Sequence, residues 1–179
     1  MPFGAVEVSS RMFSNACLDT LTEADIEIVA RLGEVIWRSH YAKMLSVAQI
    51  DYMLAGRYTP DKLCRYFNAD DRWLELLKLA GKPVGYCSYA RTSTPNEMKL
   101  EQLYLLRKHR GKGLGGFMLR HVEVQARRHG LSVLMLQVNK RNVEPIAFYH
   151  KAGFTVREEA TFDIGNGFVM DDYVMVKML

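Results

Sequence analysis

The sequence predicts a mixed α/β or α+β domain with a mostly antiparallel central sheet flanked by helices. Three features indicate this fold class: helical segments come first, a strand meander follows, and a strand–helix–strand unit precedes a final hairpin. A chain of 179 residues is long enough to bury one sizeable core. We therefore expect residues 1–179 to form a single domain.

Three helices are expected before the strands. Residues 22–40 begin with a threonine cap and carry apolar side chains at helical spacing. Ser46 caps a second helix, VAQIDYMLAGR, and Thr59-Pro60 opens a third, DKLCRYF.

A meander of strands comes next. WLELLKLA and PVGYCSYART have the character of two strands, joined by a turn at Gly81-Lys82-Pro83. TPNE predicts another turn, and MKLEQLYLL predicts a third strand. A helix follows, with an apolar stripe that starts at Leu114 and an end at Gly130. The apolar run LSVLMLQV predicts a strand covered on both faces, so residues 98–138 should form a right-handed parallel crossover.

The end of the chain predicts a short helix and a hairpin. VEPIAFYHKAG has Pro145 in its first turn and Gly153 past its end, as helix boundaries favour. FTVREEATFDI and FVMDDYVMVKML should pair across Gly165-Asn166-Gly167. The sheet is therefore expected to hold one parallel pair among antiparallel strands.

Composition narrows the class of protein. No apolar run is long enough to cross a bilayer, and the N-terminus lacks the apolar core of a secretory signal, so we expect a cytoplasmic protein without a membrane partner. Cys17, Cys64 and Cys87 are odd in number and far apart, which predicts reduced, mostly buried thiols and no metal site. The net charge of +4 suits a polyanionic ligand, either nucleic acid or a phosphorylated cofactor. Because the basic cluster is confined to one turn and the helix behind it, nucleic acid is not expected.

The stretch RKHRGKGLGG, residues 107–116, concentrates glycines and positive charge between a strand and a helix. Free backbone N–H groups, the helix dipole and nearby cations make such a loop an anion site, and a diphosphate is its natural ligand. The loop matches GxGxxG literally, but a dinucleotide fold needs a long sheet after it and an acidic residue at the end of the second strand. That strand ends in Asn139, and only 63 residues follow Gly116, so we reject this interpretation.

The stretch LYLLRKHRGKGLGGFML resembles the acetyl-CoA-binding motif of the GNAT superfamily of N-acetyltransferases. Their pattern is Gln or Arg, two residues, Gly, one residue, then Gly or Ala, and Arg110, Gly113 and Gly115 match it. NKRNVEPIAFYHKAGF resembles the second signature of the superfamily, and the two signatures together cover about residues 100–155. The resemblance implies a GNAT-like sheet with its parallel strand pair around the CoA site. It also implies direct transfer of an acetyl group from acetyl-CoA to a primary amine.

The resemblance also implies which residues bind the cofactor. The turn that would cradle the CoA pyrophosphate consists of Arg110, Gly111, Lys112, Gly113, Leu114 and Gly115. The backbone of Leu103, Tyr104 and Leu105 would pair with the pantetheine arm, as in strand addition. Asn142 matches the asparagine of the second signature, and it either touches the cofactor or caps the following helix.

Two residues are candidates for catalysis. Tyr149 matches the superfamily's tyrosine near the CoA sulfur, where a phenol can protonate the departing thiolate; the alternative is an aromatic packed under its helix. Glu101, in the strand before the loop, is the candidate base that deprotonates the amine. It can equally be a salt-bridged strand carboxylate, and a water chain can replace a fixed base. His109 and His121 are interpreted as structural.

The sequence indicates the amine that accepts the acetyl group less clearly than it indicates the cofactor. HYAKMLSVAQIDYMLAG and TFDIGNGFVMDDYVM resemble the spermine/spermidine N-acetyltransferase-like branch, which implies a small-molecule amine such as a polyamine. A polyamine needs carboxylates, and the candidates are Asp163, Asp171, Asp172, Glu97 and Glu101. The pair Asp171-Asp172 can instead be merely solvated, and Trp37, His40 and Tyr41 either wall the acceptor site or pack the first helices.

Other functions stay open from the sequence alone. The acceptor can be a protein N-terminus, a lysine, an amino acid or an aminoglycoside. The chain can also be a non-catalytic acyl-CoA-binding module. Superfamily members are often dimers, so a homodimer is a further expectation, although no seam is assigned.

Overall fold

The structure, a computed structural model, describes residues 13–179 and contains a seven-stranded sheet. The strands lie in the order β1-β2-β3-β4-β5-β7-β6, and β4 and β5 are the parallel pair among antiparallel neighbours. This confirms the predicted sheet. The strands are β1 (Ala16–Thr20), β2 (Arg72–Leu79), β3 (Lys82–Arg91), β4 (Glu97–Leu105), β5 (Val133–Asn139), β6 (Thr155–Gly165) and β7 (Phe168–Met178).

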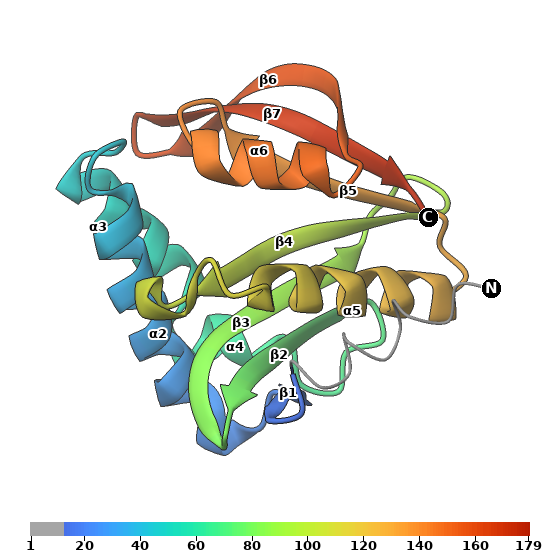
Figure 1. Ribbon diagram of the computed structural model, residues 1–179. Coiled ribbons are helices and arrows are strands. Elements are labelled where there is room, and N and C mark those ends of the chain that lie inside the picture. Colours follow the sequence, from blue (N-terminus) through green and yellow to red (C-terminus); the bar gives the residue numbers. More distant parts are fainter. Residues whose placement is uncertain (1–12) are drawn as a thin grey trace.

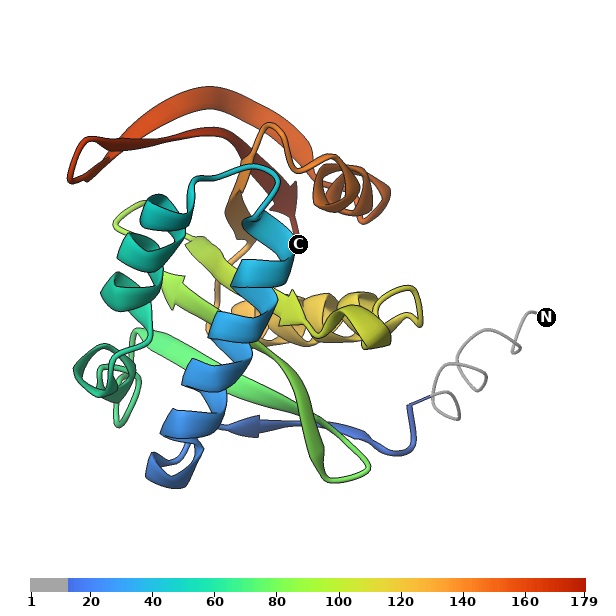
Figure 2. The ribbon, with the colours of Figure 1, turned by 90° about the vertical axis from the view of Figure 1, so that its left-hand side faces the viewer.

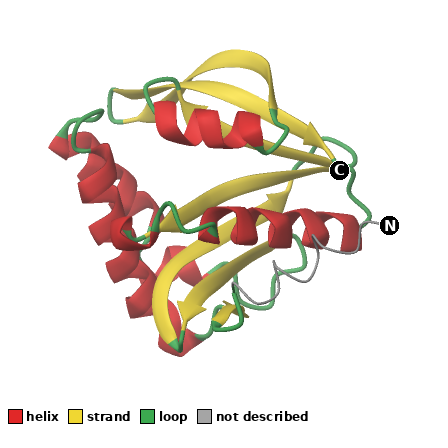
Figure 3. Ribbon diagram, in the orientation of Figure 1, coloured by secondary structure: helices red, strands yellow, loops and turns green. Residues whose placement is uncertain are grey.

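Helices cover both faces of the sheet (Figures 1 and 3). One buried core lies under α5 and α6, and a second lies under the three N-terminal helices, which include α2, nearest the viewer in Figure 2. Apolar side chains on both sheet faces thus find partners, as a layered fold requires. The helices are α2 (Ile26–Tyr41), α3 (Val47–Arg57), α4 (Pro60–Cys64), α5 (Leu114–Arg128) and α6 (Val143–Lys151), with short 3₁₀ turns η1 (Glu23–Asp25) and η2 (Arg107–His109).

The prediction that helices precede all strands is wrong, because β1 comes first. This strand has five residues and owes its place to pairing with β2, a contact that its local pattern does not reveal. The first helix also starts later than residue 22. Thr22 donates its hydroxyl and its backbone N–H to the carboxylate of Asp25, and this capping box opens η1 rather than α2.

Other local predictions are also corrected. The turn between β2 and β3 lies at Ala80-Gly81, where both residues have the positive φ of a tight two-residue hairpin, so Lys82 and Pro83 belong to β3. The third helix stops at Cys64, short of the predicted segment. Two cysteines, Cys17 on the edge strand and Cys64, are exposed, and among the described residues only Cys87 is a buried thiol.

The parting of β4 and β5 creates the space for a site. The two strands pair from Glu97 to Leu100 against Val133 to Leu136, and then β4 continues along β3 while β5 follows β7 (Figure 1). The β5-facing backbone edge of residues 101–105 therefore has no strand partner in the described sheet. A bulge at the same point leaves Glu101 between the paired residues Leu100 and Gln102, and bulges of this kind re-aim side chains beside active sites.

Candidate active site

A cavity of about 1030 Å³ occupies the space where β4 and β5 part. Its walls come from α2, α3, β4, the glycine loop, β5, α6 and the β6–β7 hairpin. In Figure 2, α2 crosses between two groups of elements: the glycine loop and α6 lie on one side, and α3 with the turn of the β6–β7 hairpin lies on the other. The cavity thus borders both groups of elements, and β4 lines it.

The glycine loop forms one end of the cavity. Gly111 and Gly113 have φ of +72° and +81°, the left-handed conformation that glycine adopts without a Cβ clash, and Gly113 is the N-cap of α5. Four loop glycines line the cavity: Gly111, Gly113, Gly115 and Gly116. The first backbone N–H groups of α5, which have no partner within the helix, thus lie at a cavity wall without side chains in the way. This end suits a phosphate-bearing ligand.

Arg110 is held in place at that end by two contacts. Its Nε donates to the carbonyl oxygen of Leu105 at 3.3 Å, and its Nη1 lies 3.2 Å from Nδ1 of His40. The other ring nitrogen of His40 lies 2.9 Å from Oδ1 of Asn142. A guanidinium only donates, so Nδ1 must accept and Nε2–H must donate to Asn142. Burial and the charge of Arg110 lower the pKa of His40, which agrees with this neutral ring.

These contacts decide two questions that the sequence left open. Asn142 is the N-cap residue of α6, but its side chain makes no cap hydrogen bond and lines the cavity. His40 does not merely pack the first helices, because it joins α2 to both cofactor motifs. Trp37 and Tyr41 do both things expected of them: they are buried in the core and they line the cavity.

Tyr149 lies on α6 and lines the cavity, with only 9% of its surface exposed. Its ring packs against Phe148 and Phe154, with centroids 5.2 and 5.5 Å away. Burial, with a smaller contribution from Tyr104, raises the pKa of Tyr149, so the phenol remains protonated at neutral pH. The side chain is therefore both packed under its helix and available as a proton donor.

The remaining predicted cofactor residues divide into two groups. Leu103, Tyr104 and Leu105 line the cavity along the unpaired edge of β4. Lys112 and Leu114 do not line it: Lys112 is exposed on the turn, and Leu114 packs in the core. Only the backbone of Leu114 is thus placed to serve a ligand, which is consistent with a loop that binds through N–H groups.

Two of the five candidate carboxylates reach the cavity. Glu101 lines it from the bulge in β4 and accepts a hydrogen bond from the hydroxyl of Tyr66 at 2.9 Å. Asp172 lines it from β7, is 7% exposed, and has a buried Oδ1 without a hydrogen-bond partner among the described residues. Burial raises the pKa of Asp172 to about 6, although a hydrogen bond with the side chain of Asn139 and the charges of Lys99 and Arg57 oppose the rise. The interpretation of Asp172 as a solvated surface residue is therefore wrong.

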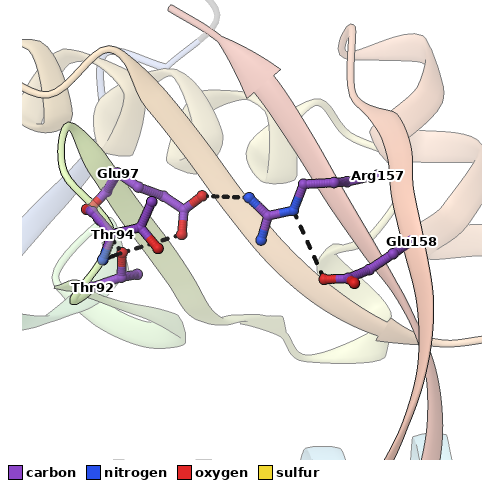
Figure 4. Close-up of polar contacts among 5 residues, drawn as sticks. All are labelled: Thr92, Thr94, Glu97, Arg157 and Glu158. Atoms are coloured by element: carbon purple, nitrogen blue, oxygen red, sulfur yellow. Dashed lines mark hydrogen bonds and ion pairs between the residues drawn. The ribbon is translucent and has the colours of Figure 1, made fainter.

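The other three carboxylates do not serve a polyamine site, which corrects that expectation. Glu97 is buried where β4 and β5 are still paired, and it accepts from Arg157 Nη1 at 2.6 Å and from Thr92 (Figure 4). Asp171 forms an ion pair with Lys140. The third, Asp163, accepts a hydrogen bond from a backbone N–H within its own hairpin.

Three further cations line the cavity away from the glycine loop, and no local sequence pattern predicts them. They are Arg57 at the end of α3, Arg65 just after α4, and Lys99 on β4. In the sequence, the two arginines look like solvated helix ends, because only the fold brings α3 and α4 against β4. The second half of the cavity is thus mixed in charge rather than acidic.

A comparison with known families agrees with this geometry. The model of the acetyltransferase (GNAT) family matches residues 37–154, a span that contains the glycine loop, Tyr149 and the parting strands. The chain belongs to this family. In the part of the chain that the structure describes, no helix is long and apolar enough to span a membrane, and no group of three His, Cys, Asp or Glu residues is arranged to hold a metal ion.

Individual relatives are distant. An uncharacterized N-acetyltransferase of Mycobacterium bovis is 33% identical over 99 residues, which is 55% of this chain and 62% of that protein. The alignment thus spans less than two thirds of that relative. A spermidine N(1)-acetyltransferase of Thermoplasma acidophilum is 24% identical over 155 residues, 84% of this chain and 92% of that protein.

Solved structures show the same fold. The PaiA N-acetyltransferase of Thermoplasma acidophilum, in complex with coenzyme A, superimposes with a TM-score of 0.78 at 22% identity, over 92% of this chain and 99% of that one. A spermidine N-acetyltransferase from Vibrio cholerae, in complex with CoA and spermine, gives a TM-score of 0.70 at 16% identity, over 92% and 96% of the two chains.

Proposed function

We propose that this protein transfers the acetyl group of acetyl-CoA to a primary amine of a small molecule by direct attack. One cavity carries the proposal. It is lined by the glycine loop, by the unpaired edge of β4 and by the protonated phenol of Tyr149. The charged residues Arg57, Arg65, Lys99, Glu101 and Asp172 line the rest of it, which we call the acceptor chamber. Membership of the acetyltransferase family supports the proposal.

The loop end of the cavity fits CoA in three respects. The N–H groups of residues 111–115 suit the pyrophosphate, and Arg110, held by His40, adds a fixed positive charge. The exposed Lys112 adds a second charge at the turn. The free edge of β4 at residues 103–105 suits the amide groups of pantetheine, which would pair with it as an added strand.

The chemistry follows from the residues beside that edge. The neutral amine nitrogen attacks the thioester carbon, a C–N bond forms and the C–S bond breaks. Tyr149 donates a proton to the departing thiolate, because its phenol is protonated at neutral pH and lines the cavity. The proton lost by the amine passes to Glu101, which faces the cavity from the bulge, directly or through water.

The acceptor is a small amine, and a polyamine is the candidate that the relatives favour. The spermidine N(1)-acetyltransferase from Thermoplasma acidophilum aligns with 84% of this chain, and Glu101 and Asp172 offer two carboxylates in the cavity. A protein N-terminus, a lysine side chain or a purely binding role are alternatives that the following assay distinguishes.

The test measures thiol release from acetyl-CoA with polyamines, amino acids, short peptides and an aminoglycoside. We expect release that depends on the amine. Tyr149→Phe should lower kcat about 100-fold or more, the usual size of a general acid's contribution, with little change in the Kd for CoA measured by calorimetry. Tyr173→Phe is the matched control, because Tyr173 packs outside the cavity lining. Tight CoA binding without release from any amine would instead establish a binding module.

A further inference from the structure

Arg57 presents a positive charge to the acceptor chamber. No described residue neutralises this charge by contact. It is the last residue of α3, its side chain is accessible, and it lines the cavity. Its guanidinium lies over the ring of Trp37, 5.9 Å from the centroid, and makes no ion pair or side-chain hydrogen bond within residues 13–179. A guanidinium has five N–H donors arranged to grip a carboxylate, so these donors are free for a ligand.

The other two cations in the chamber already have partners. Lys99 donates to Oε1 of Gln137 at 2.6 Å, and Arg65 donates to the hydroxyl of Tyr66 at 3.2 Å. Burial lowers the pKa of Lys99, and the nearby carboxylate of Glu101 opposes this effect. Arg57 is thus the group in the chamber best suited to hold an anion.

A carboxylate of opposite charge faces the same space. Asp172 has a buried Oδ1 without a partner, and Arg57 is close enough to oppose the rise in its pKa, yet the two form no ion pair. A buried carboxylate oxygen without a partner is costly, whereas the donors of the exposed Arg57 are free for a ligand. An occupant with both an amine and an anion would satisfy both groups. A polyamine would satisfy only the carboxylate and would bring a cation toward Arg57.

We propose that the acceptor is a primary amine that also bears a carboxylate, with the carboxylate bound by Arg57 and the amine directed toward Asp172 and Glu101. This inference rests on the proposed acetyl transfer and specifies its substrate class. The body of the acceptor is apolar, because apolar side chains line the same cavity as the charged groups. These are Met53, Phe162, Ile164 and Met170.

The test compares acceptors that differ only in the anion. One set consists of methionine, methioninamide and 3-(methylthio)propylamine. The second consists of 6-aminohexanoate and hexylamine. Two sets are used because they differ in the distance between the amine and the carboxylate of the acceptor. We expect kcat/KM to be about 10- to 100-fold higher for the acid than for its amide or plain amine in at least one set. Spermidine should be a poor acceptor.

Two variants separate recognition from structural damage. Arg57→Met should lower kcat/KM for the acid about 10- to 100-fold more than kcat/KM for the plain amine, and should change the Kd for CoA little. Arg128→Met removes a charge from an exposed position at the end of α5, outside the cavity lining, and should retain the preference.

Three results would overturn the inference: equal rates for acid and amide, an Arg57→Met enzyme that keeps the preference, or an equal loss of rate on acid and plain amine. Spermidine as the best acceptor would also overturn it, and would leave the acetyltransferase assignment standing. Absence of thiol release with every amine is a different outcome, because it refutes the proposed acetyl transfer itself.

Discussion

Asp172→Asn should make the protein more stable at neutral pH. The wild-type side chain is almost fully buried, and its Oδ1 has no hydrogen-bond partner among the described residues. Ionising such a carboxylate is unfavourable, and this raises its pKa from 3.8 to about 6. Asparagine has nearly the same shape and carries no charge, so the substitution removes the cost of the buried ion and keeps the packing.

The magnitude follows from that rise in pKa. A rise in pKa of about 2 units, at 1.36 kcal/mol per unit, corresponds to a loss of at most roughly 3 kcal/mol in the free energy of unfolding when Asp172 is ionised. Solvent in the cavity reduces this loss to about 1–2 kcal/mol. Below about pH 4 the folded and unfolded states both hold the proton, and the cost is absent. Above about pH 6 both states have lost it, and the cost is complete. The raised pKa therefore lowers wild-type stability as the pH rises through this window.

Urea unfolding of the two proteins near pH 5 and near pH 8 measures this effect. The free energy of unfolding of the variant, relative to wild type, should increase by about 1 kcal/mol between the two pH values. Asp171→Asn is the matched control, because Asp171 is ion-paired with Lys140 and should give no such gain. A variant that is less stable than wild type at pH 8, or a difference that does not grow with pH, would refute the reasoning.

Two further predictions concern the cofactor loop and the base. Gly113→Ala should weaken CoA binding roughly tenfold by calorimetry, because a residue with a Cβ pays about 1–2 kcal/mol at a φ of +81°; unchanged affinity would show that the loop binds nothing. Glu101→Gln should lower kcat by about 100-fold or more and leave the Kd for CoA unchanged, and a rate within about twofold of wild type would assign the proton to water or to Asp172.

The sequence predicts the glycine loop and the helix after it well because their signals are local. The glycine loop needs Gly111 and Gly113 for their positive φ, and α5 begins directly after it, so neighbouring residues carry the information. Tyr149 likewise stands within one short helix. The sheet is predictable for the same reason, except for β1, whose five residues depend on pairing with β2.

The acceptor half depends on contacts between distant segments, and the sequence gives no local sign of it. Arg57 and Asp172 lie more than a hundred residues apart and meet only because α3 and β7 both border the gap between β4 and β5. Glu97 and Glu101 look equivalent on one strand. Their environments differ because Glu97 precedes the point where the strands part and Glu101 follows it.

The most direct test of acetyl transfer is to measure the two products together in one reaction. Wild-type protein is incubated with acetyl-CoA and the best acceptor amine, and free CoA thiol and N-acetylated amine are quantified over time by thiol titration and mass spectrometry. The account predicts equal amounts of the two products, both strongly reduced by Tyr149→Phe. Thiol without acetylated amine would indicate hydrolysis, and neither product alongside tight CoA binding would indicate a binding module; either result contradicts the account.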